Sequence, residues 1–185
     1  MKLTVLAKMP WSVNEGWPEL AQRHPAVLDV VASLALPLAL LPPAMLYFAG
    51  TRYPEAFAPL VPTKDWAAVA LVFLLAEMLT FVAMGWLIKK VAQTYELHVD
   101  RHDAYLLAAI TPVPLWLASL GLLIPSLIAN LVLSAFALGI SCALLYNGLM
   151  AWSREHESMA AVRVVHVVTS AGLAAWALLL VLAFF

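Results

Sequence analysis

The chain has a single cysteine, few charged residues and none of the common catalytic signatures. Cys142 is the only cysteine among 185 residues, so an intramolecular disulfide and a cysteine-based metal site are both excluded. Only 11% of the residues are charged, and the formal net charge of −1 leaves no basic surface for nucleic acid. No nucleophile elbow, glycine-rich phosphate loop or pair of catalytic carboxylates is present. We therefore expect no enzymatic activity, no cofactor and no nucleic-acid partner.

Apolar residues make up 64% of the chain and gather in five long stretches. About 20 apolar residues in a helix cross a hydrocarbon core of ~30 Å. The stretches cover approximately residues 27–50, 66–88, 104–123, 127–150 and 164–185. Continuous apolar runs indicate helices, because a lone strand would leave its backbone groups without partners in lipid. The sequence predicts an all-α membrane protein, with residues 27–185 forming a bundle of five transmembrane helices in the lipid bilayer.

Residues 1–26 mix apolar side chains and tryptophans with charges, and they do not form a span. Tryptophan prefers the headgroup region, and a short helix after Pro10 could lie along the cytoplasmic leaflet. The alternative is a partly ordered tail that only touches the bundle. We therefore expect a short interfacial or cytoplasmic N-terminal segment, and the residues do not decide between these two arrangements.

Lysine and arginine are distributed unevenly between the two sides of the predicted bundle. One side carries Lys2, Lys8, Arg23, Lys89, Lys90, Arg101, Arg154 and Arg163, which are eight of the ten basic residues. The other side carries only Arg52 and Lys64. Because cytoplasmic loops of membrane proteins are enriched in these residues, the N-terminus is predicted to be cytoplasmic and the C-terminus extracytoplasmic.

The fourth stretch carries small or polar residues at every fourth position: Ala135, Gly139, Ala143 and Asn147. These positions stack on one face of a helix, and such faces allow close helix packing in lipid. We expect this face to pack inside the bundle. A seam between two copies of the chain is the alternative use of the same residues.

Several short motifs resemble those of a known family. They are the run Thr111-Pro112-Val113-Pro114-Leu115-Trp116-Leu117, then Pro125, and the run Ala143-Leu144-Leu145-Tyr146-Asn147-Gly148-Leu149. Together with Pro10 and with Ala83-Met84-Gly85 running into Tyr95, they resemble bacterial members of the Yip domain family. These are small inner-membrane proteins related to the eukaryotic Ypt/Rab-interacting proteins.

The resemblance implies a five-span inner-membrane protein that organises or shapes the membrane or a membrane complex, with other membrane proteins or further copies of itself as partners. Eukaryotic relatives bind small GTPases through a longer N-terminal region. Only about 26 residues precede the first span here, and the Asp-Leu-Tyr-Gly-Pro motif of those relatives is missing. GTPase binding is therefore not carried over to this chain.

Glu77, in the middle of the second stretch, is the residue best placed for chemistry inside the membrane. A carboxylate at the bilayer centre costs at least about 2.5 kcal/mol, so we expect Glu77 to face the bundle interior and to meet a donor. Thr80, one turn away, and Thr111, at a comparable depth, are the candidate partners. The favoured interpretation is a neutral structural acid, and the alternative is a small transporter or channel that moves protons or cations through Glu77.

Two weaker polar groups lie near the cytoplasmic boundary. Asp29 enters the first span and Arg163 the fifth, and we expect an ion pair between them to join these helices. His98 and His102, spaced four residues apart, are weak candidates for a metal site, since this spacing places both on one face of a helix. A solvated loop explains these histidines more simply.

Overall fold

The computed structural model describes residues 9–12, 14, 16–57, 65–152 and 158–184. Five helical segments are long and apolar enough to cross a membrane: Val27–Arg52, Trp66–Thr94, Arg101–Leu123, Leu127–Trp152 and Ser158–Leu179. The described residues contain helices and no strand. The prediction of an all-α bundle with five spans is therefore confirmed, and the span ends differ from the predicted ones by at most six residues.

The first span is broken where prolines interrupt it. It consists of α3 (Val27–Val30), a π-helical turn η1 (Val31–Ala35), α4 (Leu36–Ala39) and α5 (Leu41–Arg52). The widened turn comes just before Pro37, whose ring clashes with the carbonyl one turn earlier in a regular helix. Pro42 and Pro43 then occupy the first turn of α5, where a missing N–H leaves no helical bond unmade.

The third span is broken in the same way. It consists of α8 (Arg101–Ile110), a turn at Thr111 and Pro112, α9 (Val113–Ala118) and the 3₁₀ segment η2 (Ser119–Leu123). The turn changes the direction of the span halfway across the bundle. α8 packs mainly on α7 and also on α3 and η1, whereas α9 packs mainly on α10 and also on α4 and α5.

The other three spans are continuous helices: α7 (Trp66–Thr94), α10 (Leu127–Trp152) and α11 (Ser158–Phe184). The side chain of Asp65 caps α7 by accepting hydrogen bonds from the backbone N–H groups of Ala67 and Ala68, at 3.0 and 3.2 Å. The 29 residues of α7 extend about 43 Å, more than a hydrocarbon core of ~30 Å requires. Lys89 and Lys90 lie in its last turns, where the helix leaves the apolar layer.

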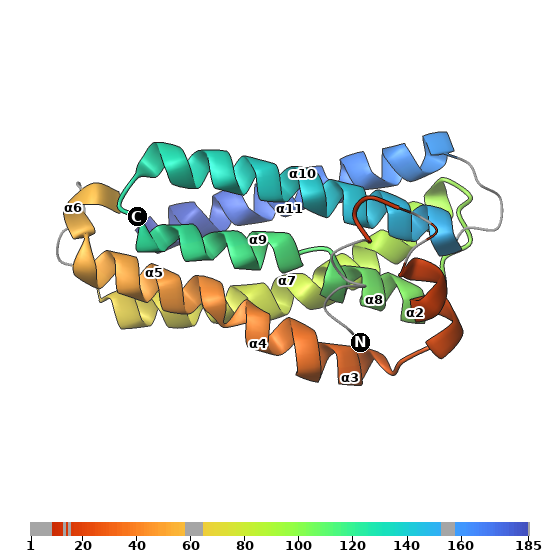
Figure 1. The fold of residues 1–185 in the computed structure, drawn as a ribbon, viewed down its shortest axis with the longest axis horizontal. Coiled ribbons are helices and arrows are strands. Elements are labelled where there is room, and N and C mark those ends of the chain that lie inside the picture. The colour runs from red at the N-terminus through yellow and green to blue at the C-terminus, as the bar shows by residue number, and fades with distance from the viewer. Residues whose placement is uncertain (1–8, 13, 15, 58–64, 153–157, 185) are drawn as a thin grey trace.

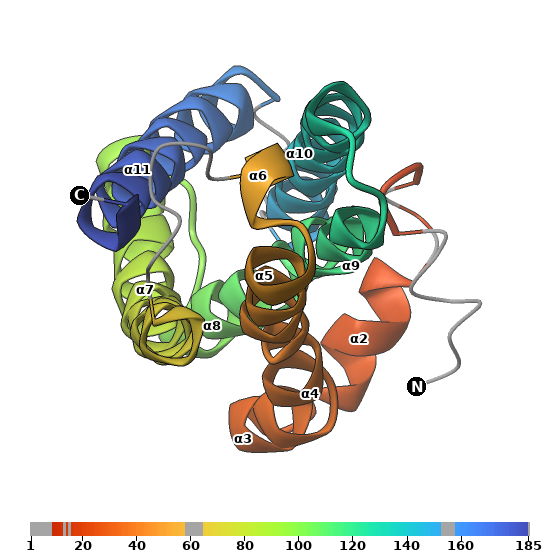
Figure 2. The ribbon, with the colours of Figure 1, turned by 90° about the vertical axis from the view of Figure 1, so that its left-hand side faces the viewer.

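Two short helices lie at opposite ends of the bundle, α2 (Trp17–Arg23) at one and α6 (Pro54–Phe57) at the other. Figure 1 shows the C-terminus at the end that holds α6, as an odd number of spans requires. The bundle is broader at the end that holds α2 and α3 (Figure 1). In the view along the bundle, α2 and α3 lie at its periphery (Figure 2).

The largest cluster of buried apolar residues lies at the α2 end. It joins Met9, Trp17 and Leu20 of the N-terminal segment to residues of α7, α8, α10 and α11, including Ile88, Leu107, Leu145 and Val164. Farther along, both α7 and α10 expose large apolar residues such as Leu75, Leu79, Leu131 and Phe136. The tightly packed half of the bundle is therefore the half that surrounds the N-terminal segment.

Candidate functional site

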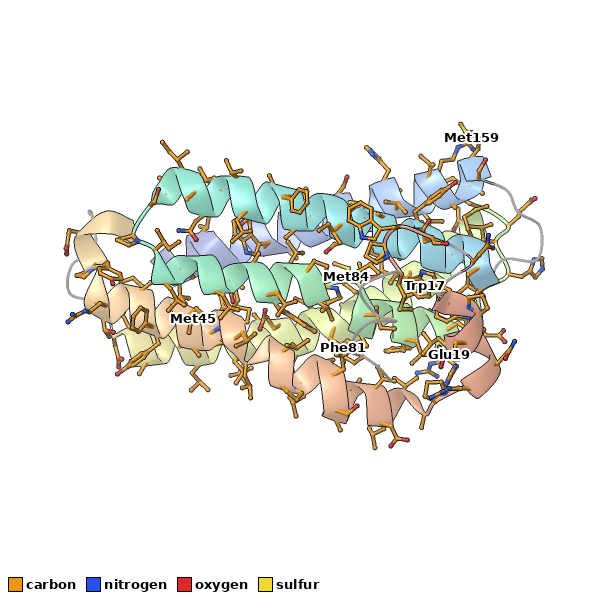
Figure 3. All side chains as sticks on the ribbon, viewed as in Figure 1. Trp17, Glu19, Met45, Phe81, Met84 and Met159 are labelled. Atoms are coloured by element: carbon orange, nitrogen blue, oxygen red, sulfur yellow. The ribbon has the colours of Figure 1, made fainter. Side chains whose placement is uncertain are left out.

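The N-terminal segment packs against the broad end of the bundle through one buried face. The side chains of Met9 and Trp17 have no exposed surface, and Leu20 is 2% exposed. Figure 3 shows Trp17 at this end, among α2, α8 and α10, whereas Met159 points away from the bundle. The two apolar residues of α2 therefore face protein rather than the leaflet. Of the tryptophans in this segment, only Trp11, which is 70% exposed, remains free to reach headgroups.

Polar contacts fix this arrangement. The Asn147 side-chain amide donates to the carbonyl oxygens of Met9 and Pro10, at 3.3 and 2.6 Å. The indole N–H of Trp17 donates to the same Met9 oxygen at 2.9 Å. Asn147 is only 9% exposed, and its bonds satisfy backbone groups that α2 cannot reach. A single residue of α10 thus anchors the start of the described chain.

Gly148 makes room for this anchor. A β-carbon at this position would collide with the Leu107 side chain and would lie 2.8 Å from the Trp17 ring. The Trp17 ring also meets the Trp152 ring edge to face, with centroids 5.4 Å apart. Asn147 therefore binds the N-terminal backbone, and the absence of a side chain at the adjacent Gly148 leaves room for the Trp17 ring.

A second polar contact lies in the membrane interior. The indole N–H of Trp116 on α9 donates to Glu77 Oε1 on α7 at 3.2 Å. Trp116 is 7% exposed and packs in the space left by Ala35 and Ala39 of the first span. The Glu77–Trp116 pair therefore links the second and third spans beside the first.

The predicted hydroxyl partners of Glu77 are wrong. Thr111 Oγ1 and Glu77 Oε2 are both buried, and neither has a hydrogen-bond partner among the described residues. Thr80, which the structure also describes, makes no hydrogen bond to Glu77. The long indole of Trp116 reaches Glu77 instead. A buried indole N–H needs an acceptor, which is the signal that could have identified Trp116.

The predicted packing face of α10 is wrong in its outer half. Ala135 and Gly139 are exposed, and a β-carbon on Gly139 would meet nothing within 4 Å among the described residues. The helix packs instead through Ala137, Ser141, Leu144 and Gly148, because its first half runs along the edge of the bundle. Ala143 is half-buried, and Asn147 is buried as expected. A seam between two copies stays a prediction.

The predicted ion pair between Asp29 and Arg163 is also wrong. The Arg163 guanidinium lies 5.8 Å from the centre of the Tyr95 ring, and Asp29 is exposed on α3. Among the described residues these two side chains form no ion pair. In Figure 2, α3 and α11 lie on opposite sides of α8, which packs against α3. The first and fifth spans are therefore joined through other helices.

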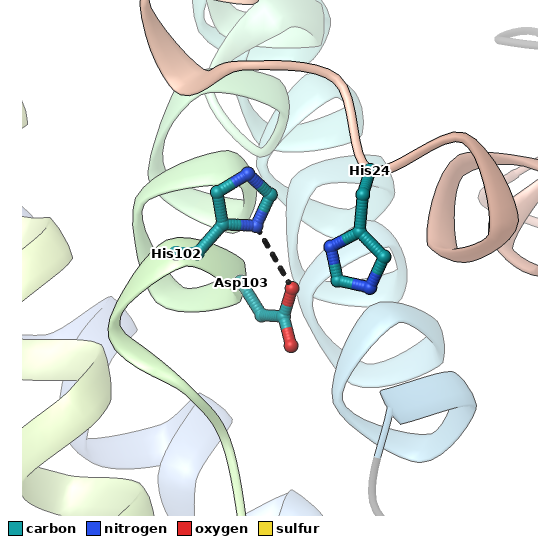
Figure 4. A group of neighbouring side chains, drawn as sticks. All are labelled: His24, His102 and Asp103. Atoms are coloured by element: carbon teal, nitrogen blue, oxygen red, sulfur yellow. Dashed lines mark hydrogen bonds and ion pairs between the residues drawn. The ribbon is translucent and has the colours of Figure 1, made fainter.

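The helical geometry that made His98 and His102 weak candidates for a metal site is not present. Helix α8 begins at Arg101, so His98 lies before the helix and the four-residue spacing does not place the two rings on one face. His102 instead lies beside His24 and Asp103, with potential ligand atoms within 4.8 Å of one another (Figure 4). Sequence spacing could not reveal this group, since His24 is 78 positions from His102.

Comparison with protein families decides what kind of protein this is. The model of the Yip1 domain matches residues 9–185. The chain belongs to the Yip1 domain family. No curated protein and no solved structure matches it. The family match begins at Met9, which is also the first residue that the structure describes, so the Yip1 domain here includes the segment that Asn147 anchors. The resemblance carried by the proline and Tyr-Asn-Gly motifs is thereby confirmed at the level of the family.

Proposed function

We propose that this Yip1 domain protein acts as a structural component that shapes the membrane, or organises a complex within it, by being broader in one leaflet than in the other. The observation that carries the proposal is the packing of the N-terminal segment against the spans at one end of the bundle, with Met9 and Trp17 fully buried. The segment adds protein cross-section to that end only.

Two further features support this wedge shape, in which the bundle is broader in one leaflet than in the other. The proline breaks in the first span direct α3 outward at the same end, so this span too widens the bundle there. The opposite end adds only the short helix α6 to the spans within the described residues. Unequal cross-section in the two leaflets favours a curved bilayer, because the lipids must fill different areas on the two sides. The proposal needs no catalytic step.

We place the broad end in the cytoplasmic leaflet of the inner (plasma) membrane. The basic residues that the structure describes at this end are Arg23, Lys89, Lys90, Arg101 and Arg163, while Lys2, Lys8 and Arg154 lie outside the described residues. An excess of lysine and arginine marks the cytoplasmic side.

Labelling should reveal this orientation. In a Cys142→Ser background, a cysteine replacing Glu55 should react with a membrane-impermeant maleimide in intact cells. A cysteine replacing His98 should react only after permeabilisation. Both residues are exposed, and they lie in α6 and in the connection between α7 and α8. Labelling of both positions from the same side would show that the number of membrane crossings between them is not odd.

Vesicle size tests the wedge. Protein inserted in a single orientation, verified by protease accessibility, should reduce the mean diameter of lipid vesicles in electron cryomicroscopy as the protein-to-lipid ratio rises. Trp17→Ala, which releases the N-terminal segment, should weaken this effect. Leu131→Ala removes a side chain that is 59% exposed on α10, and should leave the effect unchanged. Equal diameters with and without the wild-type protein would contradict the proposal.

Transport of protons or cations is the second candidate function. It is favoured by the two buried oxygen atoms, Glu77 Oε2 and Thr111 Oγ1, that lack partners among the described residues. Intramembrane carboxyl groups commonly mark proton and ion pathways. The bond from Trp116 to the other carboxyl oxygen favours a structural role instead, because it gives the acid a fixed place between two spans.

A further inference from the structure

We propose that His24, His102 and Asp103 form a site for a divalent transition-metal ion, best suited to Zn²⁺, that fastens the end of α2 to the first turn of α8. The three side chains offer two imidazole nitrogens and a carboxylate oxygen within 4.8 Å of one another. Figure 4 shows the His24 and His102 rings on either side of the Asp103 carboxylate. The inference is independent of the proposed function.

The hydrogen bonds of His102 present one of its nitrogens as a ligand. Its Nε2 lies 3.0 Å from the carbonyl oxygen of Pro25, and a carbonyl can only accept, so Nε2 carries the hydrogen. In a neutral ring Nδ1 is then left with its lone pair. A histidine that ligates a metal commonly donates its other N–H to a backbone carbonyl in this way.

That lone pair faces another acceptor. His102 Nδ1 lies 3.3 Å from Asp103 Oδ1. With Nε2 carrying the hydrogen, Nδ1 and Asp103 Oδ1 are both acceptors, and a metal ion bound by both atoms would compensate the repulsion between them. The Asp103 side chain is only 13% exposed, so water screens this arrangement weakly.

The neighbouring cations are engaged elsewhere. Arg101 lies over the Tyr105 ring, 5.8 Å from its centre, and Arg23 pairs with Glu19 at 2.8 Å. Neither guanidinium is therefore committed to the Asp103 carboxylate. The negative charge of Asp103 is therefore available to a bound cation.

His24 supplies the third ligand from a different part of the chain. It ends α2 in a left-handed conformation, with φ of 37°, and its backbone N–H donates to the Leu20 carbonyl at 3.1 Å. This conformation turns the ring towards His102, with ring centroids 5.3 Å apart. Two residues of α8 and one from the end of α2 thus converge, although 78 positions separate His24 from His102.

The donor set fits zinc. Zinc binds imidazole nitrogen and carboxylate oxygen at about 2.0–2.2 Å and is usually tetrahedral, so neighbouring ligand atoms lie roughly 3.3 Å apart. The three potential ligand atoms already lie within 4.8 Å of one another, so binding requires them to approach by only about 1.5 Å. Three protein ligands leave the fourth position for water. Because the ligands come from α2 and α8, a bound ion would tie the N-terminal segment to the bundle.

Untagged protein in detergent tests the site with Zn²⁺ as the probe. Competition with a chromophoric chelator should show one saturable zinc ion per chain, and zinc should raise the melting temperature. His24→Asn keeps a residue that tolerates the left-handed conformation, and His102→Gln keeps a donor for the Pro25 carbonyl. Each should lower zinc affinity at least tenfold and abolish the rise in melting temperature.

His166→Gln is the matched control, because it removes an exposed imidazole of α11 outside this group. It should bind zinc like the wild type. The inference is overturned if the wild-type protein binds no zinc saturably. It is equally overturned if His24→Asn and His102→Gln bind zinc as tightly as the control.

Discussion

Replacing Trp17 by alanine is expected to lower the stability of the detergent-solubilised protein by about 3 kcal/mol and to free the N-terminal segment. The Trp17 side chain has no exposed surface, packs against Gly148 and Trp152, and donates a hydrogen bond to Met9. Its loss leaves a large cavity and removes one of the two side chains that hold the backbone before α2, leaving only Asn147. Thermal unfolding measures the first effect, and the rate of proteolytic loss of an N-terminal epitope measures the second.

Trp11→Ala is the matched control for this experiment. Trp11 comes from the same segment but is 70% exposed, so its replacement should change stability by no more than about 0.5 kcal/mol. Gly148→Ala should behave like Trp17→Ala, because its methyl group would meet the Leu107 and Trp17 side chains. Equal proteolysis of the Trp11 and Trp17 variants would show that the segment does not depend on the burial of Trp17.

The anchored segment also shows what the sequence could and could not predict. The five spans were predictable because hydrophobic length is a local property, and the breaks follow from proline chemistry at Pro37 and Pro112. The burial of Trp17 was not predictable, since a tryptophan near a span suits the headgroup region as well as a protein core. Only the position of Asn147, far along the chain, decides between them.

The candidate sites depended even more on contacts between distant residues. Small residues such as Ala135 and Gly139 permit close helix packing, but they do not determine which helix packs against them. The first half of α10 lies at the edge of the bundle, so both residues are exposed. Opposite charges on Asp29 and Arg163 indicated attraction, yet the order of the helices around the bundle keeps their side chains apart. Charge and size are local properties, whereas the neighbours of a helix are set by the whole bundle.

Glu77 and Trp116 are expected to be coupled by about 1 kcal/mol, within the range for polar contacts between membrane helices. Glu77→Leu should destabilise the protein because it leaves the buried Trp116 N–H without an acceptor, and Trp116→Phe because it removes the only donor that the structure shows for the acid. The double variant should cost less than the sum of the two, since it leaves neither group unpaired. Additive losses in thermal unfolding would show that the contact contributes nothing.

Glu77→Gln separates the structural role from transport. The glutamine side-chain oxygen can still accept from Trp116, so the melting temperature should stay close to that of the wild type. Proton and cation flux should be measured in proteoliposomes of both proteins, with protein-free liposomes as the baseline. If Glu77 only links α7 to α9, neither protein conducts above that baseline. Flux that is present in the wild type and lost in a stably folded Glu77→Gln variant would instead assign the carboxyl group to an ion pathway, because the variant keeps the hydrogen bond and removes only the exchangeable acid proton.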